Sequence, residues 1–142
     1  MSSVTERCGC QSDGVLLFSC SGGSNVGQLA NEAAKALTQL GQGRMSCVVG
    51  LAAHLPDFDE KAEFSETIVA IDGCETACAR KAVEHLEHRV DVHVIVTELG
   101  IEKNHRFDLT REQIAAVAGA VADRLNALSG RVGCCADTEE RR

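Results

Sequence analysis

The sequence predicts an α/β domain of three layers, with a mainly parallel sheet whose strands are joined by helical crossovers. Two observations support this fold class. Short apolar runs typical of buried strands alternate with longer segments in which apolar residues recur at helical spacing. The chain of 142 residues also has the length of a single domain, which can bury a core without disulfides.

The first elements are a strand, a loop and a helix. The apolar run at residues 15–19 is typical of a strand covered on both faces. A loop of small residues follows at 21–25, and apolar residues then recur at helical spacing from Leu29 to Leu40. Gly41 is suited to end this helix.

The middle of the chain is less regular. Residues 45–49 fit either a strand or the start of a helix that runs through Leu51 and Leu55. The segment 56–60 is expected to interrupt this pattern, with a short helical turn after it. The apolar run 67–71 then predicts a buried strand.

The last elements carry clearer signals. A helix follows Cys78, and residues 90–96 begin with alternating polarity, which favours a strand near an edge of the sheet. Thr110 and Gln113 form a capping box, and Leu109 can pack against Ile114. The buried stripe expected for this last helix comprises Ile114, Val117, Ala118, Val121, Ala122, Leu125 and Leu128.

Composition argues against two classes of partner. The net charge is −7 and the chain lacks Trp and Tyr, so we expect no nucleic-acid partner. No apolar run reaches about eighteen residues, so we expect no membrane span. Eight cysteines without an N-terminal signal segment favour the reducing cytoplasm, where cysteine clusters more often bind metals or catalyse reactions.

The most informative motif is Asp72-Gly73-Cys74-Glu75-Thr76-Ala77-Cys78, at a strand-to-helix turn. Free N–H groups at a helix start stabilise thiolates, which bind metals or attack substrates. Two cysteines four residues apart share one face if both lie on the helix. The motif therefore predicts that the sulfurs of Cys74 and Cys78 point to one centre.

Cys20 and Cys74 each follow a predicted parallel strand, so both should lie at the carboxyl edge of the sheet. Cys78 lies one turn further on. If Cys47 also reaches this edge, the four sulfurs suit zinc or an iron–sulfur cluster. A buried hydrophobic role for Cys47 is nearly as well supported.

These motifs resemble those of the DGC-domain family, small prokaryotic proteins that are named for the tripeptide Asp72-Gly73-Cys74 and whose metal is presumed to be zinc. The segments that carry the resemblance are Cys20-Ser21-Gly22, Ser24-Asn25, Gly27-Gln28, Met45-Ser46-Cys47, Ile71 to Cys74 with Cys78, and Gly100-Ile101 with Lys103. The resemblance implies that Cys20, Cys47, Cys74 and Cys78 form the cysteine set of the family, and it supplies no reaction.

The leading hypothesis is a cytoplasmic protein that binds zinc through these four cysteines, to store or transfer the metal or to stabilise the sheet edge. A second hypothesis is a thiol-dependent redox or sulfur-handling enzyme, with Cys74 or Cys20 as the attacking thiolate and Cys78 as its resolving partner. A third is an iron–sulfur protein with the same ligands. Whether the protein is an enzyme stays open at this point.

The folded domain is expected at residues 14–130, between a flexible arm at 1–13 and a flexible tail at 131–142. Both ends contain paired cysteines, which are either a second thiol site or adventitious. These are Cys8, Cys10, Cys134 and Cys135.

Other polar side chains have less specific roles. Asp72 is expected to accept hydrogen bonds from backbone N–H groups at the helix start. Glu98 and Lys103 are candidates for an acid, a base or an anion contact. The histidines divide into two possible nitrogen ligands, His54 and His105, and three that are expected to be solvated, His85, His88 and His93.

Overall fold

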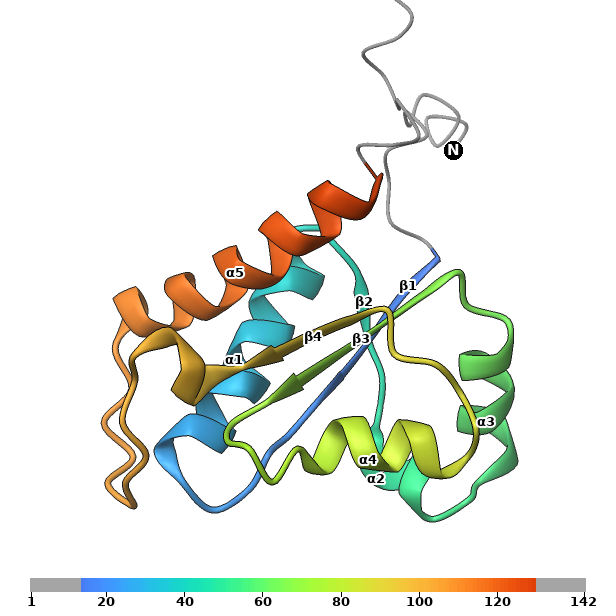
Figure 1. Cartoon of the computed structure of the whole chain (residues 1–142), viewed down its shortest axis with the longest axis horizontal. Helices are drawn as coiled ribbons and strands as arrows, with labels where there is room; N and C mark the ends of the chain where they lie inside the picture. Colours follow the sequence, from blue (N-terminus) through green and yellow to red (C-terminus); the bar gives the residue numbers. More distant parts are fainter. Residues whose placement is uncertain (1–13, 130–142) are drawn as a thin grey trace, which may run out of the picture.

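A computed structural model describes residues 14–129. In this part of the chain, four parallel strands form one sheet in the order β2-β1-β3-β4, with helices on both faces (Figure 1). The strands are β1 (Val15–Ser19), β2 (Arg44–Met45), β3 (Thr67–Asp72) and β4 (Val92–Ile95). The predicted three-layer α/β fold is confirmed.

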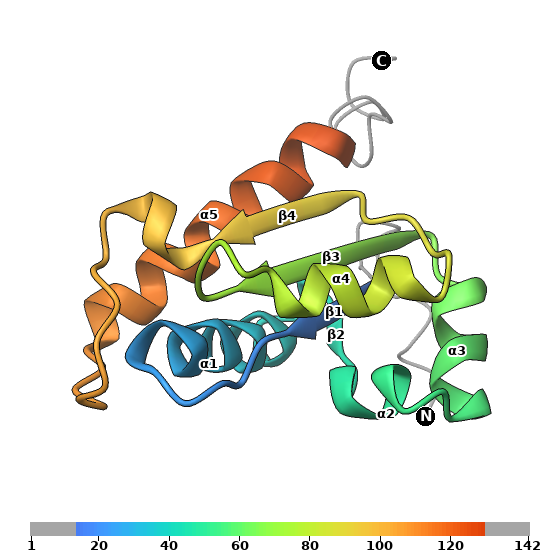
Figure 2. The same ribbon diagram turned by 60° about the horizontal axis from the view of Figure 1, so that its bottom comes forward.

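The helices divide between the two faces of the sheet (Figure 2). One face is covered by α1 (Asn25–Gln39) and α5 (Arg111–Ser129). The other is covered by α2 (Val48–Ala52), α3 (Pro56–Glu63) and α4 (Cys78–His85). A short 3₁₀ turn, η2 (Val96–Leu99), follows β4.

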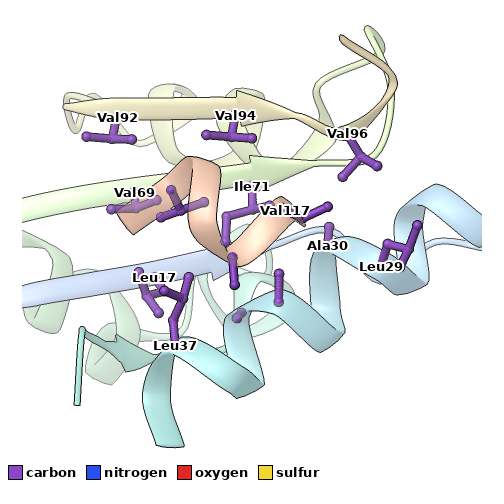
Figure 3. Packing of buried hydrophobic residues seen from close by; sticks show 14 of the residues in the cluster. Leu17, Leu29, Ala30, Leu37, Val69, Ile71, Val92, Val94, Val96 and Val117 are labelled. Carbon is purple, nitrogen blue, oxygen red and sulfur yellow. The ribbon is translucent and has the colours of Figure 1, made fainter. Parts of the chain in front are cut away.

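Alternating residues of the central strands supply two cores. Leu17, Val69 and Ile71 are fully buried against α1 and α5, which Figure 3 shows in close-up. Leu16 and Phe18 face the opposite side and pack with α2, α3 and α4. Each large apolar side chain buried in this way contributes roughly 1.5–3 kcal/mol. The continuous apolar run at 15–19 is thus explained by a strand covered on both faces.

The predicted capping box at the start of α5 is confirmed. The Thr110 hydroxyl accepts the N–H of Gln113 at 3.1 Å, and the side-chain amide oxygen Oε1 of Gln113 accepts the N–H of Thr110 at 3.2 Å. At the start of α1 the Ser24 hydroxyl accepts the N–H of Gly27.

Several boundaries differ from those expected. Residues 44–52 contain both of the alternatives, because β2 ends at Met45 and α2 begins at Val48. Pro56 begins α3 instead of interrupting a pattern, since the first helical position needs no N–H donor. Leu40 and Leu128 lie at helix ends and remain exposed.

The flexible ends that the sequence predicts, residues 1–13 and 131–142, lie outside the described residues. So do the four cysteines that these ends contain. Within residues 14–129, no helix combines the length and the apolar character needed to cross a lipid bilayer.

A close approach between two glycines joins α1 to the end of β3. A Cβ atom on Gly73 would lie 2.7 Å from the backbone nitrogen of Gly27 and 2.8 Å from the carbonyl carbon of Val26. Backbone cannot move aside as a flexible side chain can, so only glycine fits at Gly73.

Replacement of Gly73 by alanine should therefore lower the free energy of unfolding by about 1–3 kcal/mol, as overpacking does. Urea denaturation measures this change. Gly23→Ala is the matched control, because nothing lies within 4 Å of a Cβ at that position. Equal stabilities of the two variants would contradict the close contact.

Candidate functional site

The candidate site lies at the carboxyl edge of the sheet, between β1 and β3. From β1 the chain continues to β2 on one side, and from β3 it continues to β4 on the other side. In open α/β sheets this reversal opens a crevice in which ligands bind. Cys20 follows β1 and Cys74 follows β3, and these strands pair in register up to Ser19 and Ile71. The two cysteines therefore lie on the same edge, as their positions in the sequence predict.

Cys20 is half-buried between the loops that follow β1 and β3. Its backbone N–H donates to the carbonyl of Ile71 at 2.8 Å, and its sulfur accepts the N–H of Gly22 at 3.3 Å. Burial raises the pKa of the Cys20 thiol, backbone hydrogen bonds from Gly22 and Gly73 offset part of this shift, and the negative charges of Asp72 and Cys78 add to it. Cys20 thus favours the protonated thiol.

Cys74 has the opposite character. Its sulfur lies 3.5 Å from the Thr76 hydroxyl and 3.5 Å from Nζ of Lys103. Hydrogen bonds from Thr76 and then the ammonium group of Lys103 lower the pKa of the Cys74 thiol, despite a small opposing effect of burial. Cys74 therefore ionises more readily than Cys20.

Cys74 and Cys78 do not share a helix face. Cys74 lies in the turn before α4, Ala77 adopts a left-handed conformation with φ 56°, and Cys78 is the first helical residue. The expectation that both cysteines lie on one helix face is therefore wrong. Cys78 is exposed, and its charge acts on Cys20 instead.

Cys47 caps α2. It is exposed, and its sulfur accepts the N–H of Gly50 at 3.3 Å. The alternative that Cys47 is a buried hydrophobic residue is wrong. Because Cys47 follows β2, it too lies at the carboxyl edge of the sheet.

Asp72 is the last residue of β3, the strand that precedes α4, and it stabilises the start of α4. Only 1% of its surface is exposed, and its carboxylate accepts the N–H groups of Ala79 at 2.7 Å and Arg80 at 3.1 Å. The expected role as acceptor for helical N–H groups is confirmed. The ring Nε2 of His93 lies 2.9 Å from the same carboxylate.

Two histidines differ from the sequence expectation. The side chains of His93 and His88 are only 16% and 9% exposed, and each contacts a carboxylate, Asp72 and Asp59 respectively. They are therefore not simply solvated. His85 is exposed, and its ring lies 5.3 Å from that of His54.

Asn25 holds the segment that carries Lys103, a role the sequence did not indicate. Its side chain donates to the carbonyl of Glu102 at 2.9 Å and accepts the N–H of Asn104 at 2.6 Å. These contacts enclose Lys103 on both sides and place residues 100–110 beside the start of α1 (Figure 1). Glu98 and His105 are exposed nearby.

Comparison with known proteins assigns the family. A family model described as the DGC domain matches residues 16–121, which include all four edge cysteines and Lys103. This chain belongs to the DGC domain family. It is 33% identical over 93 residues to the Anaerobic and virulence modulator AnvM of Pseudomonas aeruginosa, an alignment that covers 66% of this chain and 71% of AnvM. No solved structure matches the chain.

The donor chemistry of this DGC domain suits a soft metal ion, but its geometry is not that of a preformed centre. Cys20, Cys47, Cys74 and Cys78 are all free. Within residues 14–129, no three His, Cys, Asp or Glu side chains are grouped so that they could hold a metal ion. The structure therefore shows an edge that carries free thiols, without a closed ligand cage.

Removal of the Asp72 carboxylate should destabilise the DGC domain, because Asp72→Ala leaves buried N–H groups of α4 without an acceptor. The expected loss is about 1–3 kcal/mol in the free energy of unfolding, measured by urea denaturation. Asp108→Ala, which removes an exposed carboxylate, is the control and should change little. A loss no larger than that of the control would rule out the anchoring role.

The lowered pKa of Cys74 predicts faster alkylation near neutral pH than at Cys20, since the thiolate is the reactive form. Thr76→Val and Lys103→Met should each raise this pKa, so that alkylation at about pH 7 slows and the midpoint of the pH–rate profile moves upward. Iodoacetamide labelling with peptide mass spectrometry measures the rate at Cys74. Lys81→Met removes a positive charge elsewhere and should leave the profile unchanged; equal shifts in all three variants would exclude a specific contact.

Proposed function

We propose that this DGC domain binds zinc through cysteine thiolates at the carboxyl edge of its sheet, and that it stores or transfers the ion or uses it to stabilise this edge. The ligand set is Cys20, Cys47, Cys74 and Cys78. One observation carries the proposal: four free cysteines follow three neighbouring strands, and N–H donors contact three of their sulfurs.

The N–H donors matter because thiolates concentrate negative charge. Four thiolates around one zinc ion carry a formal charge of about −2, which nearby donors must offset where water is partly excluded. Gly22 donates to Cys20, Gly50 donates to Cys47, and Lys103 contacts Cys74. When bound, zinc would hold the thiolates deprotonated and cross-link the segments that carry them.

The sulfurs must approach one another for such a centre to close. Cys47 and Cys78 are exposed and so have room to change rotamer, and Cys74 lies in a turn. Cys20 is held between two loops and is the natural fixed point. Metal binding should therefore draw the loops together and raise the stability of the domain.

The full chain, purified without oxygen or added metal, should contain about one zinc ion in the edge site. Inductively coupled plasma mass spectrometry measures the zinc and iron content of the protein. A sulfide assay on the same samples identifies an iron–sulfur cluster if one is present. Cys20→Ser and Cys74→Ser should each reduce zinc, and chelation should lower the melting temperature of the native protein.

The matched control replaces the four terminal cysteines by serine. That variant should keep the zinc at the edge, and any additional metal that it loses would belong to a second thiol site formed by Cys8, Cys10, Cys134 and Cys135. Unchanged zinc in all four single serine variants at the edge would defeat the proposal.

A second candidate function is that of a thiol-dependent redox or sulfur-handling enzyme. The contact of Lys103 and Thr76 with the Cys74 sulfur favours it, because a stabilised, accessible thiolate is a nucleophile. Cys78 is the candidate resolving thiol. Zinc-bound sulfur resists alkylation, so fast alkylation of Cys74 in the protein as purified would support this function over zinc binding.

A further inference from the structure

A cavity of about 470 Å³ opens beside Cys47, on the far side of β1 from the crevice between β1 and β3. Its volume falls in the range of roughly 300–1,000 Å³ that is typical of small-molecule sites. The cavity lies between the ends of β1 and β2 and the helices α2 and α3. The lining residues used below are Ser19, Ser46, Cys47, Phe58 and Lys61.

An unsatisfied polar group lies behind the cavity wall, in the lining residue Ser46. The Ser46 hydroxyl oxygen is buried and has no hydrogen-bond partner within the described part of the chain. A buried hydroxyl without a partner costs about 1–3 kcal/mol, so such groups normally find a ligand or an ordered water. Ser19, also buried, lines the same space.

The charge of the wall selects an anion. Lys61 is the single charged residue that lines the cavity, and among residues 14–129 no carboxylate lies within ion-pair distance of its ammonium group. Its Nζ instead lies 5.2 Å from the centre of the Phe58 ring. The protein as a whole carries a net charge of −7, and Lys61 gives this wall a local positive charge. An occupant with a carboxylate would supply the missing counter-charge.

The remaining functional group in the wall is a thiol. Cys47 is free and exposed, and the N–H of Gly50 contacts its sulfur. A free thiol beside an anion-selective cavity is placed to exchange with the sulfur of a small bound molecule.

We propose that this cavity binds a small anionic disulfide, one that bears carboxylate groups, and that in the zinc-free protein Cys47 exchanges with it to form a mixed disulfide. The Cys47 thiolate attacks one sulfur of the bound molecule, the S–S bond breaks, and its electron pair leaves with the second sulfur as a small thiolate. The proton lost from Cys47 passes to solvent or to the departing thiolate. The disulfide is itself the oxidant, and the modified protein retains the carboxylate-bearing half beside Lys61.

The test uses the full chain under nitrogen, as purified and after chelator treatment. Oxidised glutathione is the anionic probe, and cystamine is the cationic probe of similar chemistry. Peptide mass spectrometry gives the rates of adduct formation at Cys47 and at Cys78, which is equally free and exposed but does not line the cavity. In the chelator-treated protein we expect oxidised glutathione to modify Cys47 at least about fivefold faster than Cys78, and cystamine to show no such preference.

Lys61→Gln should remove the preference for oxidised glutathione, and Lys61→Glu should reverse the order of the two probes at Cys47. Lys35→Gln is the matched control, because Lys35 is an exposed lysine of α1 that is already paired with Glu32. Lys61 is exposed, so these variants should fold, and their melting temperatures check this.

Equal rates at Cys47 and Cys78, or an unchanged preference in Lys61→Gln, would overturn the inference. Zinc content is measured in the same samples. A failed preference in chelator-treated protein whose untreated form contained zinc counts against the cavity alone, whereas absence of zinc from the protein as purified, with the preference intact, counts against the proposed zinc site alone.

Discussion

The parallel pairing of β1 with β3 is the constraint on which the rest of the edge depends. The ladder continues beyond the last residue of β1, because the N–H of Cys20 bonds to the carbonyl of Ile71. The loops after both strands are therefore held side by side, and the absence of side chains at Gly27 and Gly73 lets α1 close over them. Hydrogen bonding of the backbone, rather than a side-chain contact, therefore positions Cys20.

This arrangement gives two neighbouring cysteines opposite acid–base properties. Burial raises the pKa of Cys20, whereas Thr76 and Lys103 lower the pKa of Cys74. A metal ion bound by both would have to displace the proton of Cys20, which makes binding depend on pH. A redox reaction would use the same difference, with Cys74 as the attacking sulfur. The opposite pKa shifts of Cys20 and Cys74 are thus relevant to both metal binding and redox chemistry.

The sequence predicted the strands and caps well because their signals are local: apolar runs, a capping box, small residues at turns. It also placed Cys20 and Cys74 on one edge, since parallel strands end together. The contact of Lys103 with Cys74 was not predictable in the same way. It depends on the side chain of Asn25, which lies 77 residues before its partner Glu102. The environment of Cys47 likewise requires knowledge of which helix packs beside β2.

Two lysines give Cys74 and Cys47 different surroundings at this edge of an acidic protein. Lys103 contacts Cys74 directly, whereas Lys61 lines the cavity at Cys47 and pairs with no carboxylate in the described chain. A net charge of −7 repels small anions at a distance, so an anion that arrives must be held by local contacts. The cation at Cys74 is engaged by a sulfur of the protein itself, and the cation at Cys47 is free to engage a ligand. In the zinc-free protein, this edge can therefore keep the Cys74 thiol in contact with Lys103 and present the Cys47 thiol to small molecules.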